Sequence, residues 1–468
     1  MTQSPTLRVA TPGFSGLVGF GRRDITPPVG IRNRNWGAAA TDTATGVHRP
    51  FILSVLALKT DTTSSPLLIA GVDGTHWRRV DDWESLQCRV LDELGLEAGQ
   101  LIVNLSHTHS GPVLTASHAD LAGGEYLVAY LDRLAEALVG AGRDALADLC
   151  EGSVDWYTGS SSVAVNRDLD LDGRALVGFN PDIPADDTVL IGRVCAGDGA
   201  HLATVVNYAC HPTTLAWENC QLSPDYVGEL RETVESHTGA PCLFLQGASG
   251  DLSPRLQYSG DTELADRHGR AIGLAVLAAL ETMPPPATDL VYGEAVESGA
   301  PVAVWRADKR TASTTLRYGT EISVLPLRPL SSCAELAEEW ADILPQSRDE
   351  RLRRVRDLRE GYLDLDNRPD DVDHPMWIAR IGDALLVAHP GEAYSWLQTE
   401  LRQRFPQAPV LVLNLSNGPG FVYLPDRDAY RRDAYQAWQT VFAPGALEKF
   451  TDDASTALHA LLAADDLG

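Results

Sequence analysis

The sequence predicts an α/β protein in which mixed β-sheets are flanked by helices. Three observations support this fold class. Short apolar runs rich in Val, Ile and Leu recur along the chain, and longer amphipathic segments lie between them. Each apolar run is too short for a typical helix, so it is interpreted as a buried strand. The runs end in loops of Gly, Ser, Asn, Asp or His, which places polar groups at strand ends, where α/β proteins commonly form their sites.

Six apolar segments predict the strands, and they share one design without repeating at a fixed period. In chain order they are PLLIAGVDGTHW (66–77), LIVNLSHTHSGP (101–112), LATVVNYACHPTT (202–214), PCLFLQGASGDLSP (241–254), ALLVAHPGEAYSWL (384–397) and PVLVLNLSNGPGFVYLP (409–425).

Four amphipathic segments predict helices. They span residues 125–146, 262–283, 333–365 and 445–466. The third is highly charged, and we expect a surface excursion there that Pro345 breaks or kinks. We expect a single domain over 1–468, with a weak sub-domain boundary in the proline-rich stretch 282–290.

The composition excludes several classes of partner. The 468 residues are 44% hydrophobic and 22% charged, as in ordinary globular proteins, and the formal net charge is −26. Such a chain repels nucleic acid and anionic membrane surfaces. No apolar stretch is long enough to cross a membrane and no signal peptide is visible, so we expect a cytoplasmic protein without stable membrane insertion. The seven cysteines include no C-x-x-C pair, which disfavours a disulfide framework.

The segment 101–112 contains two histidines one residue apart. Side chains alternate along a strand, so His107 and His109 are expected to point the same way at the end of this strand. Two imidazoles on one side indicate a metal site or a proton-transfer pair. The alternative is a polar loop with two solvated histidines.

Three further candidate metal ligands follow other predicted strands. His211 lies in CHPTT, Glu392 in HPGEAY and Tyr423 in GFVYLP. Catalytic zinc is typically held by about three N or O ligands, which these residue types supply. Each also has a structural interpretation: a strand cap for His211, a helix start for Glu392 and a packed aromatic ring for Tyr423. His389 competes with Glu392 as a ligand.

The other notable histidines carry no such motif. They are assigned structural or surface roles: His48, His76, His118 and His268.

Several of these motifs, in this order, resemble the neutral ceramidase family. They are VGFGRRDITPP, SHTHSGP, NYACHPTT, GASGDLSP, HPGEAY, the Tyr423 segment and FAPGALEKF. The resemblance runs from about Val18 to about Leu462 and covers the family's catalytic domain, as in a short bacterial member. The sequence departs from the family pattern at DITPP, which is usually DITGP, and in lacking extra glycines after His109. Neither an export signal nor a C-terminal immunoglobulin-like domain is expected.

The resemblance implies a Zn²⁺ ion and assigns its ligands. These would be His107, His211, Glu392 and Tyr423.

Four further residues receive catalytic roles from the resemblance. His109 would face the scissile amide without binding the metal, and Arg167, in AVNRD, would face the substrate. Tyr435 would donate a hydrogen bond near the bound carbonyl. Ser253, in GDLSP, aligns with a serine proposed as a nucleophile in some family members. No base lies beside Ser253 in the sequence, so a binding or positioning role is favoured.

The implied function is zinc-dependent hydrolysis of an N-acyl amide, either a ceramide-like lipid or a natural-product amide. Alternatives are a zinc esterase or lactonase, an acyl-transferring or condensing enzyme, and a non-catalytic metal-binding relative. A metallo-β-lactamase would need H-x-H-x-D-H, and a dinucleotide enzyme G-x-G-x-x-G; neither motif is present. The expected partner is a small or lipid-like amide substrate, and a homo-oligomer is compatible with the sequence.

Overall fold

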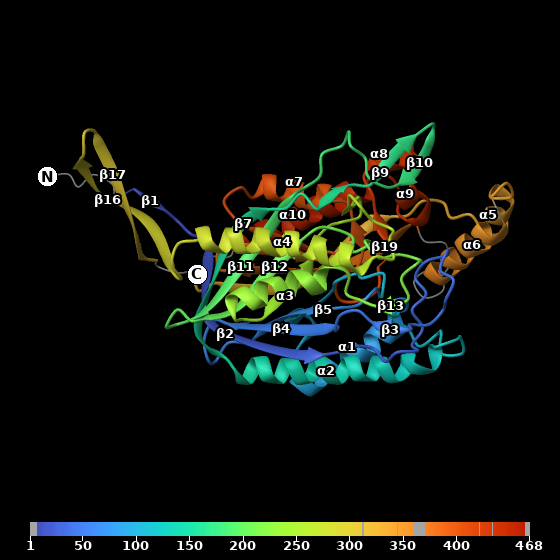
Figure 1. The fold of residues 1–468 in the computed structure, drawn as a ribbon, viewed down its shortest axis with the longest axis horizontal. Helices are drawn as coiled ribbons and strands as arrows, with labels where there is room; N and C mark the ends of the chain where they lie inside the picture. Colours follow the sequence, from blue (N-terminus) through green and yellow to red (C-terminus); the bar gives the residue numbers. More distant parts are fainter. Residues whose placement is uncertain are drawn as a thin grey trace.

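The structure, a computed structural model, describes residues 7–310, 313–343, 345–359, 370–420, 422–432 and 434–463. It confirms the predicted α/β class: two mixed sheets are flanked by helices (Figure 1). Each of the six predicted apolar segments contains a strand that begins within a residue of the segment's start. Residues 360–365, the end of the third predicted helical segment, lie outside the described residues.

The larger sheet has eight strands and is antiparallel in its centre. Its two outermost pairs, β5–β6 and β12–β14, are parallel. The sheet curls, so that β14 at one edge also contacts β4, β5 and β6. In spatial order the strands are β14 (Cys242–Gln246), β12 (His201–Tyr208), β11 (Thr188–Ala196), β7 (Cys150–Ser160), β2 (Gly13–Asp24), β4 (Ile52–Lys59), β5 (Leu67–Val72) and β6 (Leu101–Leu105).

The second sheet has four strands and packs against the first. Its parallel pair is β20–β22. Buried residues from both sheets, including Val205 of β12 and Leu386 of β20, form one shared core cluster. Its strands in spatial order are β18 (Leu316–Pro326), β19 (Asp371–Ile381), β20 (Ala384–Ala388) and β22 (Val410–Leu413).

Helices cover the outer faces of both sheets. One pair packs on β2 and β4, a second on β7, β11 and β14, and a third on the four-stranded sheet. In that order the pairs are α1 (Val80–Leu94) and α2 (Leu127–Ala147), α3 (Tyr226–Thr238) and α4 (Thr262–Thr282), and α7 (Trp396–Arg404) and α10 (Ala446–Ala463).

The charged segment forms two helices, as its proline predicts. α5 (Cys333–Glu339) ends before the proline, and α6 (Pro345–Arg359) starts with it, because a proline at the first helical position lacks only an N–H that would have no helical partner. Both helices lie at one end of the molecule (Figure 1).

Short elements complete the chain near the strand ends. They are β3 (Gly46–Val47) paired with β13 (Gln221–Leu222), β8 (Ala164–Asn166) with β15 (Leu252–Pro254), β9 (Asp168–Leu171) with β10 (Arg174–Val177), β21 (Glu392–Ala393) with β23 (Tyr423–Leu424), the 3₁₀ turns η1 (Ala98–Gln100) and η2 (Gly124–Tyr126), and helices α8 (Arg427–Arg431) and α9 (Tyr435–Gln439).

A three-stranded arm projects from the end of the molecule that carries the N-terminus (Figure 1). It is made of β1 (Arg8–Val9), β16 (Thr288–Glu297) and β17 (Pro301–Lys309). The boundary predicted at residues 282–290 falls where α4 ends and this arm begins.

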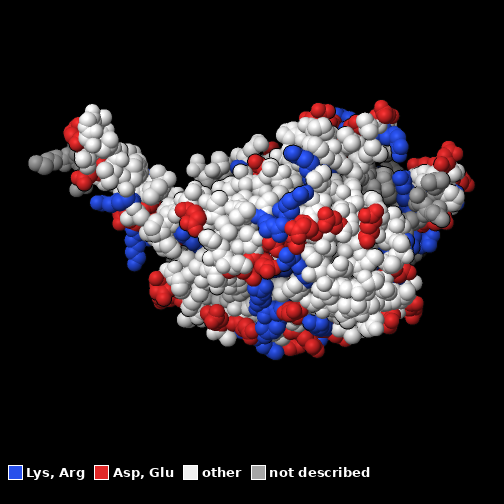
Figure 2. Space-filling view, viewed as in Figure 1, with Lys and Arg blue, Asp and Glu red and all other residues white. Residues whose placement is uncertain are grey.

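The surface mixes both signs of charge. Figure 2 shows acidic and basic side chains interspersed on one face, with wide uncharged areas between them. None of the helices in the described part of the chain is long and apolar enough to cross a membrane.

Candidate metal centre

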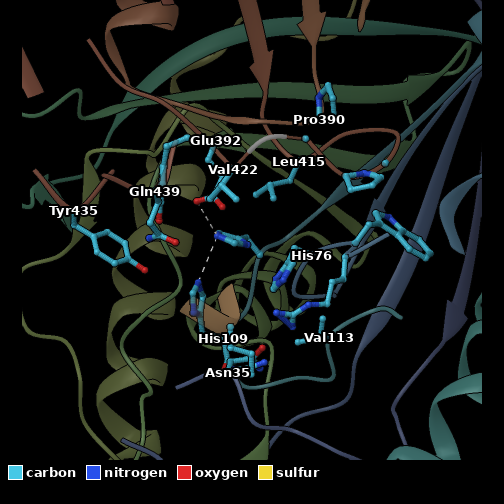
Figure 3. Close-up of a pocket in the computed structure, with 18 of the residues that line it drawn as sticks. Asn35, His76, His109, Val113, Pro390, Glu392, Leu415, Val422, Tyr435 and Gln439 are labelled. Carbon is cyan, nitrogen blue, oxygen red and sulfur yellow. Dashed lines mark hydrogen bonds and ion pairs between the residues drawn. The ribbon is translucent and has the colours of Figure 1, made fainter. Parts of the chain in front are cut away.

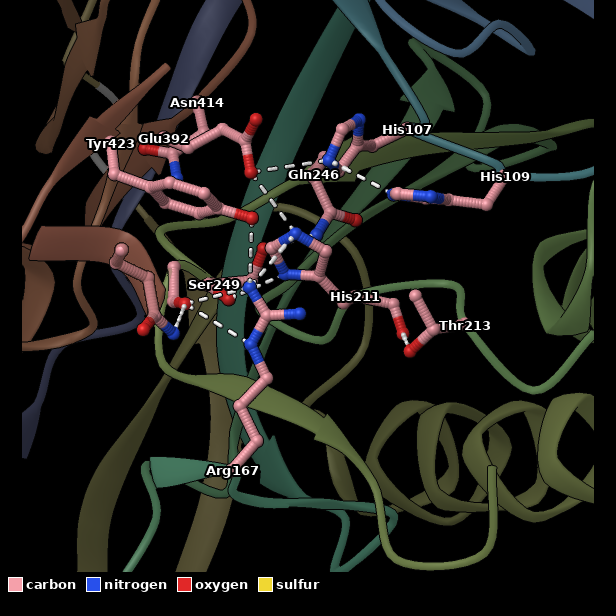
Figure 4. A network of polar contacts seen from close by, with 12 residues as sticks. His107, His109, Arg167, His211, Thr213, Gln246, Ser249, Glu392, Asn414 and Tyr423 are labelled. Atoms are coloured by element: carbon pink, nitrogen blue, oxygen red, sulfur yellow. Dashed lines mark hydrogen bonds and ion pairs between the residues drawn. The ribbon is translucent and has the colours of Figure 1, made fainter. Parts of the chain in front are cut away.

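Loops that follow the carboxyl ends of parallel strands meet at one place. The loop after β6 carries His107, the loop after β12 carries His211, and the segment after β20 carries Glu392 (Figure 4). The loop after β14 contributes the carbonyl groups of Ser249 and Gly250. The curl of the larger sheet places β14 beside β6, and β22 of the second sheet contacts β12 and β14, so these side chains come together although they are far apart in the sequence.

His107 is held in a specific tautomer by the backbone. Its ring is buried, and its Nδ1 lies 2.8 Å from the carbonyl oxygen of Thr75. A carbonyl only accepts hydrogen bonds, so Nδ1 carries a proton and donates it. The opposite nitrogen, Nε2, faces Glu392, whose Oε2 lies 3.2 Å away.

The route by which His107 and His109 come together differs from the prediction. β6 ends at Leu105, so strand alternation does not orient the two rings. His107 instead has a left-handed backbone with φ of 67°, which turns the loop. The two Nε2 atoms nevertheless lie 3.4 Å apart.

His211 is oriented in the same way as His107. Its Nδ1 donates to the carbonyl oxygen of Ser249 at 2.6 Å, and its Nε2 lies 3.0 Å from Oε2 of Glu392. Burial, followed by the positive charge of Arg167, lowers the pKa of His211 to about 3. The ring is therefore neutral at physiological pH, and its Nε2 offers a lone pair.

Glu392 lies directly opposite Tyr423 in the short parallel pair β21–β23. The two segments approach closely because Gly420 has no side chain: a Cβ there would lie 2.6 Å from the backbone of Pro390 and Gly391. Burial opposes ionisation of Glu392, but the imidazoles of His107 and His211 outweigh it and hold its pKa well below 4.5.

The two known separations between the candidate ligand atoms of these three residues match those around a tetrahedral metal ion. Oε2 of Glu392 is 3.0 Å from Nε2 of His211 and 3.2 Å from Nε2 of His107. Ligands bound at about 2.0 Å in a tetrahedron are about 3.3 Å apart. Both Nδ1 atoms donate to carbonyls, which fixes the ring orientation as in many protein metal sites.

His109 belongs to a second group of residues that could hold a metal ion. One ligand atom each of His107, His109 and His211 lies within 4.8 Å of the others. Unlike the other two rings, His109 is half-buried, and it contacts the tilted ring of Trp36 at 5.2 Å between ring centroids. Burial and the neighbouring imidazoles lower the pKa of His109 well below 6.5, so the ring is neutral. Its position at the cavity suits a group that exchanges protons with a substrate.

Tyr423 and Arg167 lie next to each other, beside Glu392 and His211 (Figure 4). Nη2 of Arg167 donates to Oη of Tyr423 at 3.2 Å and lies 3.2 Å from Nε2 of His211. Burial raises the pKa of Tyr423 well above 10, and the charge of Glu392 adds to the rise. The phenol therefore carries its proton in this arrangement.

Arg167 is almost fully buried, with 3% exposure, and it is not among the residues that line the cavity at the site. Its Nε and Nη2 both donate to the carbonyl oxygen of Gly250, at 3.1 and 2.8 Å. In this structure the guanidinium contacts protein groups around the donors, whereas the resemblance implied a substrate-facing position.

A cavity of about 130 Å³ opens onto the site. Tyr435 and Gln439, both on α9, lie on the side of Glu392, and Asn35 lies beside His109 (Figure 3). Tyr435 lines the cavity. Its ring centroid is 5.9 Å from that of Tyr423.

Several cavity residues had no sequence motif. His76, which the sequence left as a structural or surface histidine, lines the cavity, and its ring centroid is 6.5 Å from that of His107. Asn35 donates to the carbonyl oxygens of His109 at 3.3 Å and Gly111 at 2.6 Å, and so supports the histidine loop. The polar run RNRN (32–35), in the loop between β2 and β3, would have been the only sequence hint to Asn35.

Comparison with known proteins identifies structures with a similar fold. No family model and no curated protein matches the chain. Two solved structures match over 96% of it, each with a TM-score of 0.67 and 16% sequence identity. One is a ceramidase complexed with C2, covered over 76% of its length, and the other is neutral ceramidase from Pseudomonas aeruginosa, covered over 74%.

The chain has the neutral ceramidase fold.

Within this ceramidase fold, Ser253 is fully buried on β15 and does not line the described cavity. Its Oγ has no hydrogen-bond partner among the described residues, so no base contacts it there. This placement offers no support for a nucleophilic role.

His389 is part of the packing behind Glu392 in the ceramidase fold. Its Nε2 donates to Oδ1 of Asn414 at 2.8 Å, and its Nδ1 accepts from the backbone N–H of Gly391 at 3.2 Å. His374 also contacts Nδ1, at 3.1 Å. Both nitrogens of His389 are used, and the residue supports the turn that presents Glu392.

Proposed function

We propose that this chain is a zinc-dependent hydrolase of N-acyl amides. One observation carries the proposal: Nε2 of His107 and Nε2 of His211 both point at Oε2 of Glu392, at 3.2 and 3.0 Å. Acceptors converge in this way around a cation. The ceramidase fold adds support, because both similar solved structures are ceramidases.

His107, His211 and Glu392 would hold the zinc, and Tyr423 is the proposed fourth ligand. The donor set of imidazole nitrogens and a carboxylate suits Zn²⁺, which in such sites polarises a carbonyl group and lowers the pKa of water. Arg167 contacts both Tyr423 and His211, and its positive charge would stabilise Tyr423 after loss of the phenol proton.

The residues at the cavity supply the remaining chemistry. His109 is neutral, so it can remove a proton from the attacking water and return it to the departing amine nitrogen. The hydroxyl of Tyr435 would donate to the carbonyl oxygen as negative charge develops there. Cleavage of the C–N bond then leaves a carboxylic acid and an amine, and the water is consumed.

Metal analysis combined with a substrate screen tests the proposal. We expect about one zinc per chain in the purified protein, loss of that zinc in His211→Ala, and release of fatty acid from N-acyl amides detected by mass spectrometry. Oxygen esters with the same acyl chains serve as the comparison for the esterase alternative. Full amide turnover by metal-free protein, or by His107→Ala, would contradict the assignment.

A further inference from the structure

The cavity wall contains a concentration of positive charge. Arg34, Arg78 and Arg353 line the cavity and come from three separate segments: the loop between β2 and β3, the loop after β5, and α6. Glu392 is the only acidic residue among the described residues of the lining, and its carboxylate contacts two imidazoles. The whole chain has a formal net charge of −26, so this local excess of arginine contrasts with the rest of the protein.

The loops that carry Arg34 and Arg78 are fixed to the candidate metal centre. Asn35, next to Arg34, donates to the carbonyl oxygens of His109 and Gly111. The backbone N–H of Arg78 donates to the carbonyl oxygen of Leu114 at 3.2 Å, in the segment that follows the histidines. These contacts position the loops of Arg34 and Arg78 relative to the candidate metal centre.

The pKa of His118 shows the effect of the positive charge in this region. Burial, followed by the charges of Arg78, Arg32 and Arg353, lowers the pKa of His118 to about 4. Three guanidinium groups thus act on one imidazole. Asp42 offsets part of this charge, since its carboxylate lies 3.0 Å from Nη1 of Arg34 and 3.8 Å from Nη1 of Arg32.

Arg34, Arg78 and Arg353 each present a guanidinium group to the cavity from a different segment. Guanidinium groups bind carboxylates and phosphates through paired N–H donors, and such bonds are among the stronger hydrogen bonds in proteins. A cavity that places an amide at the metal centre and arginines on its wall suits an amide with an anionic group.

We propose that the substrate is an N-acyl amide bearing a carboxylate or phosphate group, which Arg78 binds together with Arg34 and Arg353. This inference rests on the proposed amide hydrolysis and specifies its substrate class. It separates this chain from an enzyme for neutral lipid amides, whose head group offers no negative charge to an arginine.

A matched set of substrates tests the inference. N-lauroylglycine, N-lauroyl-O-phosphoethanolamine and N-lauroylethanolamine share one acyl chain and differ in carrying a carboxylate, a phosphate or a neutral hydroxyl. We expect kcat/KM for one of the two anionic amides to exceed that of the neutral amide about 10- to 100-fold, the range for a hydrogen bond to a charged group. The better of the two identifies the anionic group.

Paired variants localise the effect. In Arg78→Gln the ratio of anionic to neutral kcat/KM should fall about 10- to 100-fold, with partial recovery in Arg78→Lys. Arg79→Gln is the control, because Arg79 binds Asp81 and does not line the cavity. On α6, Arg353→Gln should lower the ratio, whereas Arg356→Gln, at an exposed position, should not.

Binding measurements separate failure of this inference from failure of the proposed function. Calorimetric titration of the three amides into the zinc-loaded protein reports selectivity whether or not they are cleaved. Tighter binding of an anionic amide, lost in Arg78→Gln, supports the anionic site even without turnover, in which case only the hydrolase assignment fails. Equal or better binding and cleavage of the neutral amide would overturn the inference and leave the hydrolase intact.

Discussion

Tyr423→Phe provides a sharp test of the proposed metal site, because a phenol must lose its proton to bind zinc as a strong ligand. In the structure its hydroxyl accepts from Arg167 at 3.2 Å, and burial keeps its pKa well above 10. The group is therefore protonated at neutral pH in the metal-free protein, and zinc binding should release that proton. Phenylalanine has none to release.

The magnitude follows from proton counting. Wild type should release about one more proton per zinc than Tyr423→Phe, since every other donor is the same in both proteins and its contribution cancels. The logarithm of the zinc association constant should then rise about one unit more steeply per pH unit in wild type, or about 1.4 kcal/mol per unit. Below pH 10, the wild-type advantage shrinks as pH falls.

The measurement is calorimetric titration of zinc into chelator-treated protein, in buffers of different ionisation enthalpy at pH 7. Tyr435→Phe is the matched control, because Tyr435 lines the same cavity, with its ring 5.9 Å from that of Tyr423, but is not among the proposed ligands. Equal proton release by wild type and Tyr423→Phe, with equal affinity, would show that Tyr423 is not a metal ligand.

Three other outcomes are expected. Ser253→Ala should keep kcat within about threefold of wild type, since its Oγ contacts no described base; a loss of about a thousandfold would restore the nucleophile hypothesis. His109→Gln should lower kcat by about 10²- to 10⁴-fold while zinc content stays unchanged, and simultaneous zinc loss would make His109 a ligand. Asp155→Asn should cost about 3–5 kcal/mol in urea unfolding, because buried Arg310 and Arg193 lose their carboxylate partner at 2.8 and 3.0 Å; a change below about 1 kcal/mol would contradict this.

The sequence was informative where a single segment determines the structure. Apolar runs predicted the strands before the candidate site and placed His107, His211 and Glu392 in the segments that follow them. The convergence of these residues depends on the curl of the larger sheet and on the packing of the second sheet against it. The left-handed backbone at His107 was not predictable, since no glycine or asparagine marks it. It depends on contacts with distant parts of the chain.

Tertiary contacts also explain what the sequence missed. Arg34, Arg78 and Arg353 belong to no motif and to segments with no common pattern, so only the folded chain shows that they share a cavity. Burial of Arg167 is likewise a property of the completed fold: the carbonyl that its guanidinium contacts belongs to Gly250, more than eighty positions along the chain. Local sequence patterns carry no information on such pairings.

The spread of the candidate ligands along the chain has a consequence for biosynthesis. Glu392 and Tyr423 leave the ribosome well after His107 and His211. A nascent polypeptide can therefore offer zinc only these two histidines until Glu392 has emerged. Chains truncated before residue 423 would lack a complete set of the proposed ligands.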